Sequence, residues 1–165
     1  MKFVLPRILH PIVVLLVLGS SVVLSEAGDP SEASDPNPAN DGSRLRVELT
    51  GLQNAEGNLY IAVYNSDDTW LGDDTVLEQQ VVIADSRDGE LVSAEMQLPP
   101  GEYALSIFYD SNDNGELDTN FIGIPKEPVA LSNNARPKFG PPKYKDAVFT
   151  LGEEPLTQRI DMEKI

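Results

Sequence analysis

Apolar and polar residues alternate along most of the chain after residue 42, which is the period-two pattern of strands with one buried face. In the first such segment Leu45, Val47 and Leu49 alternate with charged and polar neighbours. Similar segments, rich in β-branched and aromatic residues, are separated by polar turns. The predicted strands are 45–50, 58–64, 81–83, 91–98, 103–109, 147–151 and 156–162. About seven short strands predict an all-β protein, an antiparallel Greek-key β-sandwich of the immunoglobulin-like or transthyretin-like kind.

The segment 98–103 (LPPGEY) predicts a sharp corner between two of these strands. Proline presets φ and glycine permits the corner. Tyr103 follows at a distance from which its hydroxyl can return to the corner backbone, as in Greek-key sandwiches. The corner therefore has a predicted role in building the fold. Trp70 is interpreted in the same way, as a plug at one end of the sandwich.

The first 27 residues predict a signal peptide. Lys2 and Arg7 precede an apolar run, and Ser25-Glu26-Ala27 offers small residues at the positions that a signal peptidase reads. An uncleaved N-terminal anchor is the alternative, although the run is short for a membrane span of about 20 apolar residues. We therefore expect an exported protein, periplasmic or secreted, without membrane insertion after cleavage.

Residues 28–42 (GDPSEASDPNPANDG) contain no large apolar side chain. This composition predicts a disordered, acidic, proline-rich tether, because it cannot bury enough surface to offset the entropy of the chain. Residues 43–165 then form a single β-sandwich domain of about 120 residues, near the commonest domain size. We expect this domain to be a monomer.

Charge and composition narrow the possible functions. The formal net charge of −15 argues against nucleic acid, whose phosphates demand basic patches, and it favours cation binding. The chain has no cysteine, and its one histidine, His10, lies in the leader. The mature protein therefore lacks Ser-His and Cys-His nucleophilic machinery and the usual zinc and copper ligands. We expect no enzymatic activity and no catalytic residues.

Candidate chemistry lies in residues 110–120 (DSNDNGELDTN), where oxygen-bearing side chains fall at alternate positions. Asp110, Asn112 and Asn114 match the first three ligand positions of the D-x-[DN]-x-[DN]-G calcium loop. A hard cation such as Ca²⁺ takes about six to eight oxygens, which one tight loop can supply from every second residue. Asp118 falls at the ninth position of the same pattern.

The end of this loop departs from the calcium pattern, because Phe121 stands where a helical calcium hand has a bidentate Glu. Another carboxylate has to complete the site, and Glu127 is the candidate. The alternative is an ordinary polar turn, since Asn, Asp and Gly are common turn residues. With Glu116 contributing its backbone carbonyl, the predicted ligands of a Ca²⁺ ion are Asp110, Asn112, Asn114, Glu116, Asp118 and Glu127.

The following region, residues 123–142, is rich in proline and has little predicted regular structure. Loops of this length in compact domains are usually functional or disordered. We expect an ordered crossover beside the cation loop, held by the buried side chains of Phe121, Ile124 and Phe139.

Linked motifs in this half of the chain carry a resemblance. They are Asp110-x-Asn112-x-Asn114-Gly115-x-Leu117-Asp118-x-Asn120, Gly123-Ile124-Pro125-x-Glu127, Ser132-Asn133-Asn134-Ala135 and Lys145-Asp146-Ala147-x-Phe149. Together they resemble the DUF2141 family of exported bacterial proteins, from about Leu45 to the C-terminus. That family is of unknown function, so the resemblance implies an exported β-sandwich and does not indicate any particular activity. The Pro-Gly-x-Tyr corner also resembles transthyretin-like and carboxypeptidase-regulatory-like sandwiches, a likeness that does not transfer function.

Three functions of different classes fit these features. The favoured one is an exported, non-catalytic module, stabilised by Ca²⁺, that binds a protein or a surface glycan. The second is a structural accessory domain with no ligand beyond the cation. The third is a small carboxylate-based hydrolase such as a glycosidase, which needs two positioned acids. Asp110, Asp118 and Glu127 are the available acids, and they are better used as cation ligands.

Overall fold

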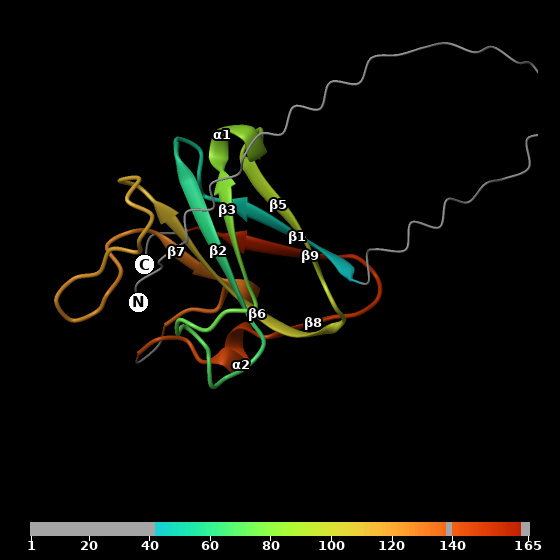
Figure 1. The fold of residues 1–165 in the computed structure, drawn as a ribbon. Coiled ribbons are helices and arrows are strands. Elements are labelled where there is room, and N and C mark those ends of the chain that lie inside the picture. The colour runs from blue at the N-terminus through green and yellow to red at the C-terminus, as the bar shows by residue number, and fades with distance from the viewer. Residues whose placement is uncertain (1–41, 138–139, 163–165) are drawn as a thin grey trace, which may run out of the picture.

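The computed structural model describes residues 42–137 and 140–162. These residues form mostly β structure in two sheets with mostly antiparallel pairing, which confirms the predicted β-rich class (Figure 1). They contain no helix that is long and apolar enough to cross a membrane. The predictions for the signal peptide (1–27), for the tether up to residue 41 and for the burial of Phe139 lie outside the described residues.

The first sheet has the strand order β4-β5-β1-β9. One of its two central strands, β1 (Ser43–Thr50), pairs antiparallel with the other, β5 (Leu91–Leu98), which in turn pairs with the short β4 (Arg87–Asp88). On its other side β1 pairs in parallel with β9 (Leu156–Asp161). This parallel pair corrects the expectation of an antiparallel fold throughout. Parallel neighbours need a long crossover, and nearly the whole domain lies between these two strands.

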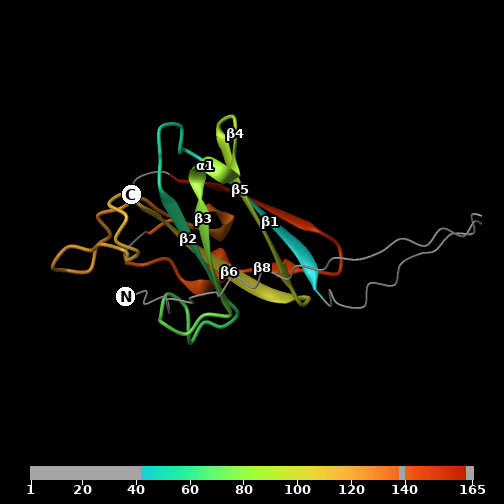
Figure 2. The ribbon, with the colours of Figure 1, turned by 45° about the horizontal axis from the view of Figure 1, so that its top comes forward.

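The second sheet has the order β3-β2-β6-β7, and β8 pairs with the beginning of β6. The longest strand, β6, is the one that leads into the acidic loop. The strands of this sheet are β2 (Asn58–Tyr64), β3 (Leu77–Val82), β6 (Gly101–Asp110), β7 (Val129–Leu131) and β8 (Phe149–Leu151). Figure 2 shows that β3, β2 and β6 run side by side.

Several element boundaries differ from those predicted. The third strand begins at Leu77 and ends at Val82, and the expected turn after it forms α1 (Ile83–Ser86) and β4. The segment expected to lack regular structure contains β7 and the 3₁₀ helix η1 (Ser132–Asn134). Ala147, expected to begin a strand, is the last residue of α2 (Tyr144–Ala147). These short elements depend on neighbours distant in sequence, so local periodicity does not reveal them.

Buried apolar residues from both sheets form one core cluster. The alternation predicted for β1 is confirmed, because Leu45, Val47 and Leu49 are all fully buried. In the second sheet β2 is buried on both faces. Aromatic residues account for its second buried face, since the Tyr60 ring stacks on Phe108 with a centroid distance of 5.0 Å.

The interpretation of Trp70 as a structural plug agrees with its contacts. Its ring meets Tyr64 and Tyr144 edge to face, with centroid distances of 5.2 Å and 5.8 Å. Its indole N–H donates a hydrogen bond to the Pro142 carbonyl at 2.9 Å. Trp70 therefore joins the loop after β2 to the segment before α2.

The predicted corner is confirmed. The Tyr103 hydroxyl donates a hydrogen bond to the Pro99 carbonyl at 2.9 Å, and the Tyr103 side chain is buried. A Cβ atom added to Gly101 would lie only 3.3 Å from the Tyr103 ring, so glycine lets the ring lie close to the backbone. The corner carries the chain from β5 in the first sheet to β6 in the second.

Candidate cation-binding loop

The acidic loop at residues 110–120 follows directly from β6 and extends away from the two sheets at one end of the molecule (Figures 1 and 2). Asp110 is the last residue of β6 and is paired with Asn58 at the start of β2. The side chain of Asp110 is only 1% exposed. The sheet therefore determines the position of the first predicted ligand.

The carboxylate of Asp110 holds the first turn of the loop. Its Oδ1 accepts a hydrogen bond from the Asn114 N–H at 3.2 Å, and its Oδ2 accepts one from the Gly115 N–H at 2.8 Å. Gly115 has a φ of 76°, in the region that side chains disfavour. The chain thus turns sharply at Gly115, and the backbone wraps around this carboxylate.

The two asparagine side chains connect the middle of the loop to Asp118. Their Oδ1 atoms accept backbone hydrogen bonds, Asn112 from Asn114 at 3.1 Å and Asn114 from Glu116 at 2.8 Å. Their Nδ2 atoms both donate to Asp118 Oδ2, at 2.6 Å from Asn112 and 3.4 Å from Asn114. The structure therefore brings together Asp110, Asn112, Asn114 and Asp118. Glu116 is exposed at the edge of this group.

Glu127 reaches the loop from the segment before β7 and is 5% exposed. Its Oε1 accepts hydrogen bonds from the backbone N–H and the hydroxyl of Ser111, at 2.8 Å and 3.1 Å. Its Oε2 accepts one from the Asp118 N–H at 3.0 Å. Both oxygens of Glu127 thus hold the loop backbone, a structural role that the sequence did not predict.

The electrostatic environment of the loop is negative. Burial raises the pKa of the Tyr60 phenol, and the charges of Asp110 and Asp113 raise it further. Asp113 is exposed and accepts a hydrogen bond from Asn58 Nδ2 at 2.8 Å. Within residues 42–137 and 140–162, no group of three or more His, Cys, Asp or Glu side chains is placed to hold a metal ion. The predicted ligand positions whose side chains converge in this loop carry two carboxylates, those of Asp110 and Asp118, and two amides, those of Asn112 and Asn114.

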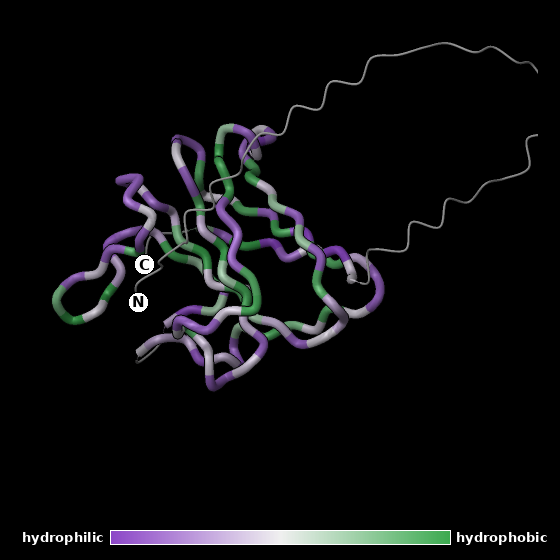
Figure 3. Tube along the Cα trace, in the orientation of Figure 1, coloured by the Kyte–Doolittle hydropathy of each residue, from purple (hydrophilic) through white to green (hydrophobic). Residues whose placement is uncertain are grey.

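Residues 118–126 form a hairpin beyond the loop. Thr119 and Pro125 form a β-bridge, and the Lys126 N–H donates a hydrogen bond to the Asp118 carbonyl at 2.8 Å. The prediction that Phe121 and Ile124 are buried is wrong, because their side chains are 98% and 52% exposed. The hairpin extends away from both sheets, so its apolar residues have no core within reach (Figure 3).

The Ser132-Asn133-Asn134 motif has a structural role that the sequence reasoning missed. The buried Ser132 hydroxyl accepts a hydrogen bond from the Leu105 N–H at 2.8 Å and donates one to the Ala147 carbonyl at 2.6 Å. Asn133 and Asn134 have φ angles of 56° and 51°, and their amides bond to the backbone after α2 and in β9. A pair of asparagines, which tolerate positive φ, was the available signal.

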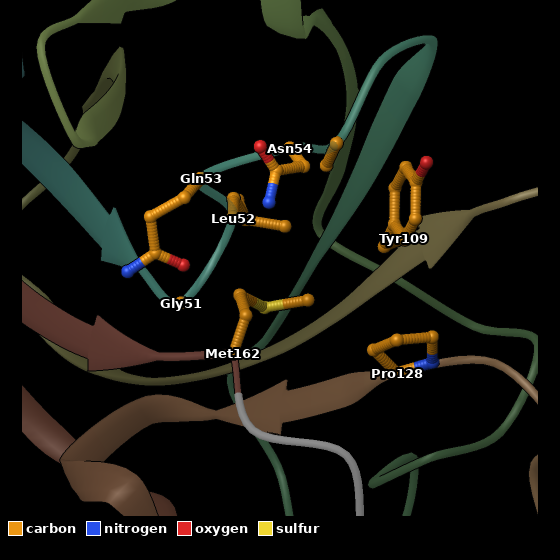
Figure 4. Close-up of a pocket in the computed structure, with 8 residues that line it drawn as sticks. Gly51, Leu52, Gln53, Asn54, Tyr109, Pro128 and Met162 are labelled. Atoms are coloured by element: carbon orange, nitrogen blue, oxygen red, sulfur yellow. The ribbon is translucent and has the colours of Figure 1, made fainter.

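A hollow of about 290 Å³ is lined by the turn after β1, by Tyr109 of β6 and by residues next to β7 and β9 (Figure 4). At one side of it the Tyr109 N–H donates a hydrogen bond to the Pro128 carbonyl at 3.0 Å. These two residues are the sequence neighbours of Asp110 and Glu127. The residues around it are Gly51, Leu52, Gln53, Asn54, Ala55, Tyr109, Pro128 and Met162. These side chains are apolar groups, two amides and one phenol, without a carboxylate or an amine.

Comparison with known proteins identifies the family. The family model described as "Uncharacterized protein conserved in bacteria (DUF2141)" matches residues 47–159, well over half of the chain. The chain belongs to the DUF2141 family. No curated protein and no solved structure matches it. The resemblance seen in the linked motifs of this DUF2141 protein is therefore confirmed, and the match spans both sheets and the acidic loop.

Proposed function

We propose that this DUF2141 protein is an exported, non-catalytic β-sandwich module that binds Ca²⁺ in the acidic loop and binds another protein or a surface glycan. The Greek-key sandwich form is supported by the tyrosine corner and by the core that the two sheets share. The observation that carries the cation proposal is the convergence of Asp110, Asn112, Asn114 and Asp118 at the end of β6.

A cation in this loop would take over the role of the two amide groups. Asp118 Oδ2 now accepts its hydrogen bonds from Asn112 and Asn114. Rotation of each amide would turn its oxygen toward an ion and give up the backbone hydrogen bond that this oxygen accepts. The Glu116 carbonyl and water would add further ligands. Ca²⁺ suits such a site better than Mg²⁺, because Ca²⁺ accepts flexible geometry. With only two carboxylates, we expect a dissociation constant of roughly 0.1–1 mM, as in extracellular modules.

The hydrogen bonds of the buried acids support a non-catalytic role. Asp110 and Glu127 each use both carboxylate oxygens to accept backbone N–H groups. A glycosidase needs one acid that donates a proton and a second that acts as base or nucleophile at a defined separation. Carboxylates that already hold the loop together are poorly placed for that exchange.

Thermal unfolding in chelator and in millimolar Ca²⁺ tests the cation site. Ca²⁺ at about ten times its dissociation constant should stabilise the fold by about 1.4 kcal/mol, and Mg²⁺ should have a smaller effect. Asp118→Asn should remove the response without lowering stability in chelator, because among the described residues the Asp118 side chain accepts hydrogen bonds from the two exposed asparagines alone. Asp110→Ala is a poorer test, since it also breaks the bonds to Asn114 and Gly115.

Asp113→Asn is the matched control, because Asp113 lies in the same loop outside the alternating positions and is bonded to Asn58. It should keep the Ca²⁺ response. A wild-type melting temperature that is the same in chelator and in 10 mM Ca²⁺ would leave the acidic loop as an ordinary polar turn. The structural-accessory alternative makes the same prediction for Ca²⁺, and it differs from the binding module in having no binding partner.

A further inference from the structure

Three apolar side chains occupy the end of the 118–126 hairpin, and we call Phe121, Ile122 and Ile124 the apolar tip. They are 98%, 65% and 52% exposed. The other large apolar side chains exposed in the described residues are Val76, Val82 and Leu91, at 37–44%. Single exposed apolar residues are ordinary, whereas a cluster of them points to an interaction site. Figure 3 shows the apolar tip at the far end of a loop whose base is polar.

The backbone of the apolar tip is held by hydrogen bonds to Asn120. Asn120 Oδ1 accepts hydrogen bonds from the Ile122 and Ile124 N–H groups, both at 3.0 Å. The Asn120 carbonyl accepts one from the Gly123 N–H at 3.0 Å, and Gly123 has a φ of 82°. A partner therefore meets a preformed surface, and little chain entropy is lost when it binds.

The acidic loop beside the base of the hairpin carries an excess of negative charge, although the hairpin itself ends at Lys126. The hairpin begins at Asp118, which is hydrogen-bonded to Asn112 and Asn114 of the acidic loop. Asp113 and Glu116 of that loop are exposed, and Lys126 is the nearest base along the chain. The whole chain has a formal net charge of −15. A binding surface complementary to this end of the molecule is an apolar pocket with a basic rim.

We propose that the apolar tip docks into an apolar pocket, rimmed by Lys or Arg, on a partner protein. This inference rests on the binding-module part of the proposed function, names the chemistry of its partner, and does not depend on Ca²⁺. Phe121 is the central anchor, since interface energy concentrates in a few buried aromatic and aliphatic side chains. The acidic loop contributes electrostatic steering and specificity.

A lipid surface and a second copy of this chain fit the same end of the molecule less well. One small apolar anchor gives marginal, reversible membrane binding, and stable attachment needs a second signal such as a basic patch. The acidic residues beside the apolar tip are repelled by anionic lipids. Pairing of two copies through their tips would bring two acidic loops together, and juxtaposed like charges oppose association.

The test places a photo-crosslinking phenylalanine analogue at position 121 of the full chain, in the cells that produce it, and at Leu91 as the control. The expected result is one polypeptide that crosslinks through position 121 and not through position 91. The crosslinked peptide should belong to an apolar pocket with Lys or Arg at its edge. That polypeptide, once purified, should bind the wild-type protein with an affinity that falls as salt rises.

Phe121→Ala should weaken that binding about thirtyfold or more, as for an interface anchor, and Leu91→Ala should leave it unchanged. Both variants should keep the urea midpoint of the wild type, because neither side chain belongs to the core. The proposal is overturned by the absence of an adduct at position 121, by an adduct with a second copy, or by sedimentation with neutral or anionic vesicles. If the apolar tip docks and Ca²⁺ has no effect on stability, only the cation site is refuted. If Ca²⁺ stabilises the fold and the apolar tip does not dock, only the proposal for the apolar tip is refuted.

Discussion

Replacing Glu127 by Gln separates a structural carboxylate from a cation ligand. The substitution keeps the size of the side chain and exchanges one oxygen for an NH₂ group. In the wild type Oε1 accepts from the Ser111 backbone and hydroxyl, and Oε2 accepts from the Asp118 N–H. In either orientation of the Gln amide, its NH₂ group faces a backbone donor, so at least one of these bonds is lost.

The size of the effect follows from the three bonds. Hydrogen bonds to charged groups contribute about 1.5–3 kcal/mol each, and an unsatisfied buried donor costs about 1–3 kcal/mol. Since the Gln oxygen keeps part of the network, we expect the free energy of unfolding to fall by about 2–4 kcal/mol. For a domain of about 120 residues, that corresponds to a melting temperature lower by roughly 6–16 °C.

Urea unfolding in chelator and in 10 mM Ca²⁺ measures this loss. The structure predicts the full loss in chelator, because the bonds of Glu127 do not involve an ion. Glu116→Gln, which changes an exposed acid of the same loop, serves as the control and should alter stability by less than about 0.5 kcal/mol. If Glu127→Gln were equally mild in chelator, the reasoning would be refuted. A loss that appears only with Ca²⁺ would make Glu127 a cation ligand, as the sequence predicted.

Two further predictions concern buried polar groups of the fold. Ser132→Ala should lower the free energy of unfolding, measured in urea, by about 2–4 kcal/mol. The reason is that it leaves the Leu105 N–H and the Ala147 carbonyl without their buried partner. A variant as stable as the wild type would contradict this. Burial raises the pKa of Tyr64 far above its usual value. Above about pH 10 the unfolded state therefore loses a proton that the folded state keeps. The free energy of unfolding then falls as pH rises. Tyr64→Phe should make that alkaline fall in the urea midpoint shallower, and equal slopes for the two proteins would exclude this contribution.

Much of the β structure was predictable because strand signals are local. The alternation of Leu45, Val47 and Leu49 predicted β1, and the corner at Tyr103 was predicted together with its hydrogen bond. The short strand β7 was missed, since its three residues form a strand only through pairing with β6. The parallel direction of β9 was missed for a related reason, because pairing direction depends on how the chain crosses between the sheets.

In the acidic loop, too, some features were predictable from the sequence and others were not. The positions of Asp110, Asn112, Asn114 and Asp118 at every second or fourth residue predicted that their side chains would converge, and the hydrogen bonds among them agree. The bonds made by Glu127 were not predictable, since a nearby carboxylate in the sequence can face either the ligand side or the backbone side of a loop.

By itself, the sequence determined those features that depend on a residue and its close neighbours: the strands with one buried face, the proline-glycine corner, and the alternating oxygen-bearing side chains of the acidic loop. Only the tertiary structure decided that both oxygens of Glu127 hold the loop backbone, that Ser132 joins three segments, and that Phe121 lies in solvent. Burial and hydrogen-bond partners depend on distances between residues far apart in the chain. An apolar residue in a hairpin therefore has the same sequence signal whether the hairpin folds onto the core or extends away from it.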